Sequence, residues 1–154
     1  MNKKTICLIG ILIVLLFLNA CGTTDNWKLI EIEKYGSIKV PKNWKFSIDD
    51  EFVYFSLEES GDSKNILVQY RSDKNINKYF AEVEELVWLQ DENFSNGACI
   101  TKNEVHYQDG SSVEMFSLYF TGPKINESME FFCLDNSISE DTLRKISKSY
   151  IMCE

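Results

Sequence analysis

The sequence predicts an α+β domain, in which a largely antiparallel sheet of about six to seven strands is covered by helices on both faces. Most segments alternate apolar and polar residues, as half-buried strands do, whereas two segments carry apolar residues at helical spacing. The segments Phe52–Leu57 and Met115–Phe120 are apolar at both phases. Because such strands leave neither face of the sheet suited to water, we expect helices on each side.

Four strands are expected in the first half of the chain. Each is a short alternating or apolar run that ends at a turn signal such as Pro41-Lys42-Asn43. The expected strands are Tyr35–Val40, Trp44–Ile48, Phe52–Leu57 and Asn65–Arg71.

The period then changes to that of a helix. Ile76, Tyr79, Phe80, Val83, Leu86 and Val87 follow one another at the spacings of a single helical stripe. This pattern predicts a helix over about Asn75–Gln90.

Three further strands and a last helix complete the domain. Gly97–Gln108 and Ser111–Thr121 flank Asp109-Gly110, a strong signal for a two-residue hairpin turn. Met129–Leu134 is the last expected strand. Ser139 can cap a final helix whose first turn is acidic and whose later turns are basic, which suits the helix dipole. Its expected buried stripe is Leu143, Ile146 and Tyr150.

This order of elements, with the Pro41-Lys42-Asn43-Trp44 turn after the first strand, resembles the PsbP-like fold over about residues 35–152. The fold is named for lumenal photosystem proteins, and many small bacterial lipoproteins share it. The resemblance implies a PsbP-like sandwich that acts in binding or assembly. The family has no common catalytic set, so no functional residue is carried over.

The N-terminus predicts an export signal. Lys3 and Lys4 precede an apolar run of 16 residues, Thr5 to Ala20, which is too short to span a bilayer comfortably. Leu18-Asn19-Ala20-Cys21 resembles the lipobox of bacterial lipoproteins, which implies lipidation of Cys21 and a cell-membrane location on the extracytoplasmic face. The expected organisation is a cleaved signal peptide over 1–20, a lipidated N-terminus and short tether over 21–34, and one domain over 35–154. An uncleaved anchor or a plain secretory signal are the alternatives.

Charge narrows the possible partners. Removal of the signal with its two lysines leaves 14 basic residues against 24 acidic ones. The excess of acid, with no basic cluster, argues against nucleic acid. We therefore expect contact with the membrane through the lipid on Cys21, and an unknown protein or small ligand as partner.

No catalytic, cofactor-binding or metal-binding residue is predicted. His106 is the single histidine, and it shares the polar phase of its strand with Glu104, so it is expected to face solvent. Cys99 and Cys133 lie in apolar segments and are expected to be buried thiols, although a disulfide involving either of them or Cys153 stays open. The acidic turns at 49–51 and 58–62 lack the EF-hand spacing.

These observations favour a non-enzymatic binding or accessory module held at the membrane by lipid. An immunity or inhibitor protein that neutralises a toxin at the cell surface is one alternative, and a carboxylate-based hydrolase is another. Aromatic residues, Trp88 among them, would mark a partner surface if several stayed exposed together.

Overall fold

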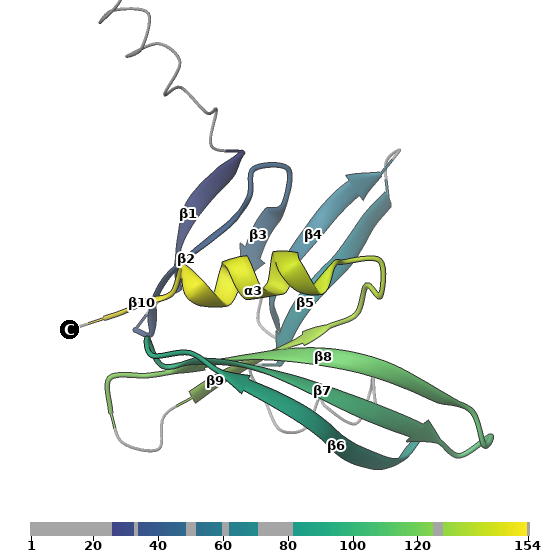
Figure 1. Cartoon of the computed structure of the whole chain (residues 1–154). Helices are drawn as coiled ribbons and strands as arrows, with labels where there is room; N and C mark the ends of the chain where they lie inside the picture. Colours follow the sequence, from purple (N-terminus) through teal and green to yellow (C-terminus); the bar gives the residue numbers. More distant parts are fainter. Residues whose placement is uncertain are drawn as a thin grey trace, which may run out of the picture.

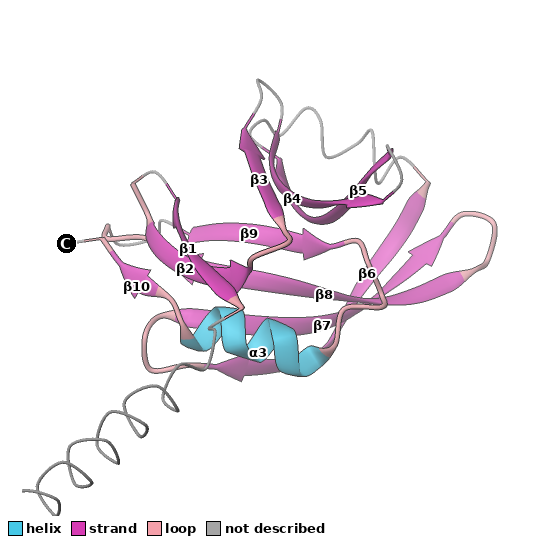
Figure 2. Cartoon of the chain, turned by 90° about the horizontal axis from the view of Figure 1, so that it is seen from above, coloured by secondary structure: helices cyan, strands magenta, loops and turns pink. Residues whose placement is uncertain are grey.

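The computed structural model describes residues 26–32, 34–48, 52–59, 62–70, 82–124 and 128–153. These residues form two antiparallel sheets, one of three strands and one of seven, and a single α-helix (Figure 1). The helix lies beside the larger sheet in both views (Figure 2). The described part of the chain is therefore mostly β.

The small sheet has the order β1-β2-β10. Its strands are β1 (Trp27–Ile32), β2 (Gly36–Pro41) and the short β10 (Ile151–Met152). Gly36 has a φ of 146°, and a Cβ at this position would collide with the carbonyl oxygen of Ile151. Glycine is therefore needed where the C-terminal strand approaches β2. β1 lies within the 21–34 segment that the sequence assigns to the anchor and tether.

The large sheet has the order β3-β4-β5-β9-β8-β7-β6. Its strands are β3 (Lys45–Ile48), β4 (Phe52–Glu59), β5 (Asp62–Tyr70), β6 (Val83–Asn93), β7 (Ala98–Tyr107), β8 (Ser112–Thr121) and β9 (Ser128–Cys133). The strands predicted before residue 72 correspond to β2, β3, β4 and β5, and those predicted after residue 96 correspond to β7, β8 and β9.

Local chemistry explains the β7–β8 hairpin. Gly110 has a φ of 83°, and the Tyr107 amide donates to the Ser111 carbonyl at 2.9 Å. The Asp109 carboxylate accepts hydrogen bonds from the amide and the hydroxyl of Ser111 at 2.9 and 2.6 Å. The hairpin predicted at Asp109-Gly110 is confirmed, but its loop has three residues and not two, because Tyr107 pairs with Ser111 and the Gly110 amide donates to the Tyr107 carbonyl at 2.9 Å.

The final helix also forms where the sequence predicts it. Helix α3 covers Glu140–Lys148, and the Ser139 hydroxyl caps it by accepting from the Thr142 amide at 3.3 Å. Leu143, Ile146 and Tyr150 are buried, as their spacing indicates.

One core lies between the two sheets and α3. Its largest fully buried side chains are the three phenylalanines Phe55, Phe120 and Phe131. The Phe131 ring lies 5.8 Å from the Phe55 ring and 6.2 Å from the Phe120 ring, measured between centroids. Burial of these three rings stabilises the fold mainly through the apolar area removed from water.

The prediction that helices cover both faces of the sheet is wrong, and so is the PsbP-like sandwich predicted with it. α3 is the one helix among the described residues, and it packs on the face that carries Ile100 and Leu118. The observation behind the prediction does hold, since Val105 and Ser117 are buried on the opposite face of β7 and β8. Two buried faces therefore do not require two helical layers.

The prediction of a helix over 75–90 is also wrong for residues 83–90, which the structure describes. Val83 to Gln90 belong to β6, which pairs with β7 from Val83↔Tyr107 to Asn93↔Cys99. Two register shifts, between Val83 and Glu85 and between Trp88 and Gln90, disturb the alternation of β6. These bulges place apolar residues at spacings that imitate a helical stripe. The first part of the predicted helix lies outside the described residues.

The signal peptide, the lipobox and Cys21 lie outside the described residues as well. The one helix among the described residues, α3, is too short and too polar to cross a bilayer.

Candidate binding surface on strand β6

Strand β6 forms one edge of the seven-stranded sheet, and its two faces differ. Paired residues of neighbouring strands lie on the same face of a sheet. Glu92 pairs with Ile100, so it lies on the face that α3 covers. Leu86 and Trp88 pair with Val105 and Asn103, so they lie on the opposite face.

Three large apolar side chains of β6 are exposed. The exposed fraction is 49% for Leu86, 62% for Trp88 and 45% for Leu89. Leu89 is the extra residue of the second bulge, since Trp88 and Gln90 pair with successive residues of β7. A bulge turns side chains away from the regular alternation, which explains why three apolar side chains meet solvent within four residues. Such a cluster is typical of contact surfaces.

Acidic residues flank this apolar cluster along the strand. Residues 82–93 contain five acids and no lysine or arginine. Glu84, Glu85 and Asp91 are exposed, and none of them forms an ion pair with another described residue. We name the exposed side chains of Glu84, Glu85, Leu86, Trp88, Leu89 and Asp91 the β6 edge.

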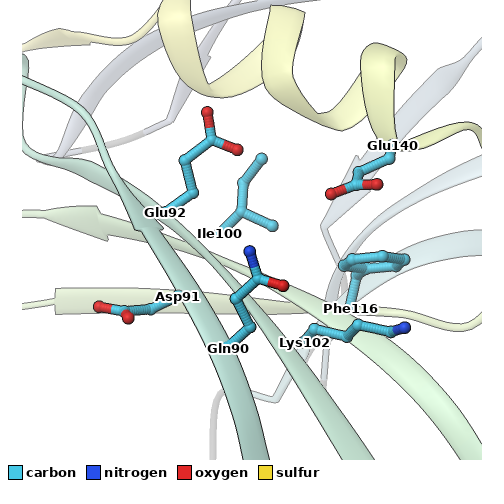
Figure 3. A pocket seen from close by; sticks show the side chains of 7 residues that line it. All are labelled: Gln90, Asp91, Glu92, Ile100, Lys102, Phe116 and Glu140. Carbon is cyan, nitrogen blue, oxygen red and sulfur yellow. The ribbon is translucent and has the colours of Figure 1, made fainter.

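Asp91 is held in place on this edge. Asn93 donates from Nδ2 to the Asp91 carboxylate at 2.8 Å. Asp91 pairs with Thr101 of β7, and Trp88 pairs with Asn103 of the same strand. The side-chain amide of Asn103 donates to the Thr101 hydroxyl at 3.1 Å. Asp91 and Trp88 therefore lie on the same face in neighbouring rows. Figure 3 shows Asp91 extending away from Phe116 and Glu140.

The face toward α3 holds two carboxylates that Arg144 joins. The guanidinium donates from Nε to Glu92 at 2.7 Å and from Nη2 to Glu140 at 2.6 Å. The pKa of Arg144 is raised by its hydrogen bond to Glu92 and by the nearby acids. Glu92 and Glu140 flank the hollow shown in Figure 3, whose volume is about 10 Å³.

This arrangement gives no support to the carboxylate hydrolase. The hollow is about large enough for one water molecule, whereas a substrate needs far more room. A pair of carboxylates bound to one guanidinium acts as an ion-pair link between β6 and α3 and is not poised to transfer protons.

A larger hollow of about 380 Å³ lies between β8 and the segment that leads from β9 to α3. Its acidic groups already have partners. Asp135 accepts from the Ser137 hydroxyl at 2.6 Å and pairs with Lys64 at 3.0 Å, and Glu114 pairs with Lys102 at 2.7 Å. The polar groups here stabilise the fold and do not converge on a ligand.

His106 and Cys99 do not form a catalytic pair. His106 lies on the polar phase of β7, as predicted, with Nε2 3.5 Å from Glu104. Cys99 is an odd-numbered residue of the same regular strand and lies on the other face. Burial and the nearby Asp91 raise the pKa of the Cys99 thiol, and burial raises the pKa of Cys133 to about 11. Both thiols therefore stay protonated and unreactive near neutral pH.

Cys99, Cys133 and Cys153 are free thiols in this structure. Cys133 is buried as predicted, Cys99 is half-buried and Cys153 is exposed. No group of three potential metal ligands occurs within the part of the chain that the structure describes. The acidic turn at 49–51 lies outside that part, and so do the side chains of Glu58, Glu59 and Asp62.

Sequence reasoning placed Trp88 in the predicted helix over 75–90 and missed the β6 edge. A signal was present in the run Leu86-Val87-Trp88-Leu89, which has more apolar residues in succession than one face of a helix can bury. Comparison of the chain with family models, with curated proteins and with solved structures finds no match.

Proposed function

We propose that this protein is a lipid-anchored, extracytoplasmic binding module that contacts a protein partner through the β6 edge. The observation that carries the proposal is the exposure of Leu86, Trp88 and Leu89 on one edge strand. Large exposed aromatic and aliphatic side chains are enriched where proteins bind one another.

The anchor is inferred from the N-terminal sequence. The motif Leu18-Asn19-Ala20-Cys21 supports lipidation of Cys21. Five residues, 22–26, separate this cysteine from β1. They reach at most ~18 Å, so the domain would stay close to the bilayer.

The arrangement of the fold suits this role. Figure 1 shows the start of β1 and strand β6 at opposite ends of the molecule. A domain tethered just before β1 can therefore hold the β6 edge away from the membrane. The acidic charge of the edge favours the same orientation, since anionic headgroups repel it.

At β6 the geometry favours a protein partner over a small ligand. The hollow beside this strand in Figure 3 is too small for a ligand, and the acidic groups of the 380 Å³ hollow are already paired. The apolar side chains of the β6 edge are exposed, which suits contact with another surface.

Site-specific photocrosslinking in the native membrane tests the proposal. The full-length protein would be expressed with a photoreactive amino acid at position 88 or, as a matched control, at position 151. Ile151 is 64% exposed but lies on β10 in the other sheet. We expect one reproducible crosslinked envelope or cell-surface protein from position 88 and none from position 151.

Two outcomes would contradict the proposal. Equal crosslinking from both positions would mean that Trp88 marks no specific surface, and a protein that stays soluble after signal cleavage would refute the anchor. A secreted toxin as the crosslinked partner would identify the binding module as an immunity protein.

A further inference from the structure

The backbone of β6 offers a short, regular edge for strand pairing. Within the described residues its one neighbour is β7. The stretch Glu85–Trp88 keeps a continuous register with β7 between the two bulges. An extended segment of another protein can add to such an edge through main-chain hydrogen bonds, and every second side chain then lies beside one face of β6.

The charge of β6 selects what can pair with it. Two copies of this edge would bring Glu84, Glu85 and Asp91 close to one another, and like charges on paired strands repel. A second copy of the chain is therefore a poor occupant. A segment that carries lysine or arginine is attracted by the same acids.

The side chains on one face of β6 suit the binding of a cation. Leu86, Trp88 and Asp91 occupy three successive rows, since they pair with Val105, Asn103 and Thr101. Trp88 offers the aromatic ring that binds a cation best, and Asp91 offers a carboxylate that Asn93 already orients. Leu86 offers an apolar contact in the next row.

We propose that the β6 edge binds an extended, basic segment of its partner, which adds as a further strand and places a lysine or arginine side chain between Trp88 and Asp91. Apolar side chains of the segment contact Leu86 and Leu89. The inference rests on the proposed function for the use of this surface, and it adds the chemistry of the partner.

A capped synthetic peptide of alternating lysine and valine serves as the probe. Its binding to the full-length protein in neutral detergent would be measured by fluorescence anisotropy of a labelled peptide. We expect saturable binding that weakens steeply with added salt, because the Debye length falls from ~10 Å at 0.1 M to ~3 Å at 1 M. Amide hydrogen exchange within β6 should slow when the peptide binds.

Matched variants locate the contact. Trp88→Ala and Asp91→Asn should each weaken binding by about tenfold, which corresponds to the loss of one cation–π contact or one partly desolvated ion pair. Ile151→Ala and Glu31→Gln, which change exposed residues of the small sheet, should leave binding unchanged. All four substitutions change exposed side chains, so loss of folding does not explain a difference in peptide binding between them.

Equal binding of a peptide in which glutamate replaces lysine would overturn the inference, and so would unchanged affinity in Trp88→Ala and Asp91→Asn. If position 88 crosslinks to an envelope protein through a segment without basic residues, the proposed function holds and this inference fails. If the lysine peptide binds β6 but no envelope protein crosslinks there, the proposed function fails and the chemistry of the edge stands.

Discussion

Asn96 joins the β6–β7 turn to the end of helix α3, and its replacement tests the packing between them. Nδ2 donates to the carbonyl oxygens of Ser147 at 2.8 Å and Tyr150 at 3.0 Å, and Oδ1 accepts from the Ala98 amide at 3.2 Å. One side chain thus closes the turn and satisfies carbonyl groups at a helix C-terminus, where partners are scarce.

The Asn96→Ala variant should lose about 2 kcal/mol of unfolding free energy. A typical intramolecular hydrogen bond contributes about 0.5–1.5 kcal/mol net, and three are removed. The loss falls below three full contributions because the Ser147 carbonyl keeps a second donor, the Tyr150 amide at 3.2 Å. Urea unfolding followed by circular dichroism measures the change, provided that the slope with denaturant stays constant.

The Asn96→Asp variant separates hydrogen bonding from size. Aspartate keeps the acceptor for Ala98, but its carboxylate faces two carbonyl oxygens at the negative end of a helix dipole. We expect it to be less stable than Asn96→Ala at neutral pH. The folded state should raise the pKa of this carboxyl above its unfolded value near ~3.9, so the penalty disappears as the pH falls and the group becomes protonated. If Asn96→Asp were as stable as the wild type at pH 7, the hydrogen bonds from Asn96 to the two carbonyl oxygens would be refuted.

Other predictions concern the core, the pH dependence and the anchor. Phe131→Ala should cost about 3–5 kcal/mol, whereas Trp88→Ala should change stability by less than about 0.5 kcal/mol; equal losses in thermal unfolding would refute the assignment of core and surface. Burial acts to raise the pKa of Asp135, but hydrogen bonds from Ser137 and the charge of Lys64 outweigh it and hold this pKa below its ordinary value. The carboxylate therefore stabilises the fold above its unfolded pKa, and the difference between wild type and Asp135→Asn should vanish as the pH falls through the lowered value; a pH-independent difference would contradict this. Cys21→Ala should release the protein from membranes, as measured by fractionation, and retention after signal cleavage would contradict lipidation.

The misassigned β6 shows where sequence reasoning reaches its limit. Val83, Leu86 and Val87 lie at helical spacing, yet they belong to a strand with two bulges. A bulge inserts one residue and shifts the phase of alternation, and an alternating pattern with two such shifts looks helical in a short window. The hydrogen-bond partners of β6 lie in β7, and no local pattern in 83–93 records them.

The candidate surface depended on the same assignment. As part of a helix, Trp88 would have lain beside the buried stripe; as part of an edge strand, it points into solvent with an exposed fraction of 62%. The acids of residues 82–93 were visible in the sequence, but the position of Asp91 on the same face as Leu86 and Trp88 became evident only with the register between β6 and β7.

The sequence by itself determined the features that depend on a few neighbouring residues: the Ser139 cap, the turn at Asp109-Gly110, and the helical spacing that buries Leu143 and Ile146. Tertiary structure decided the pairing of β10 with β2, the single helical layer, and the exposure of Trp88. The physical reason is that caps and turns are satisfied within one or two turns of chain, whereas a strand finds its hydrogen bonds, and a side chain its burial, in residues far away in sequence.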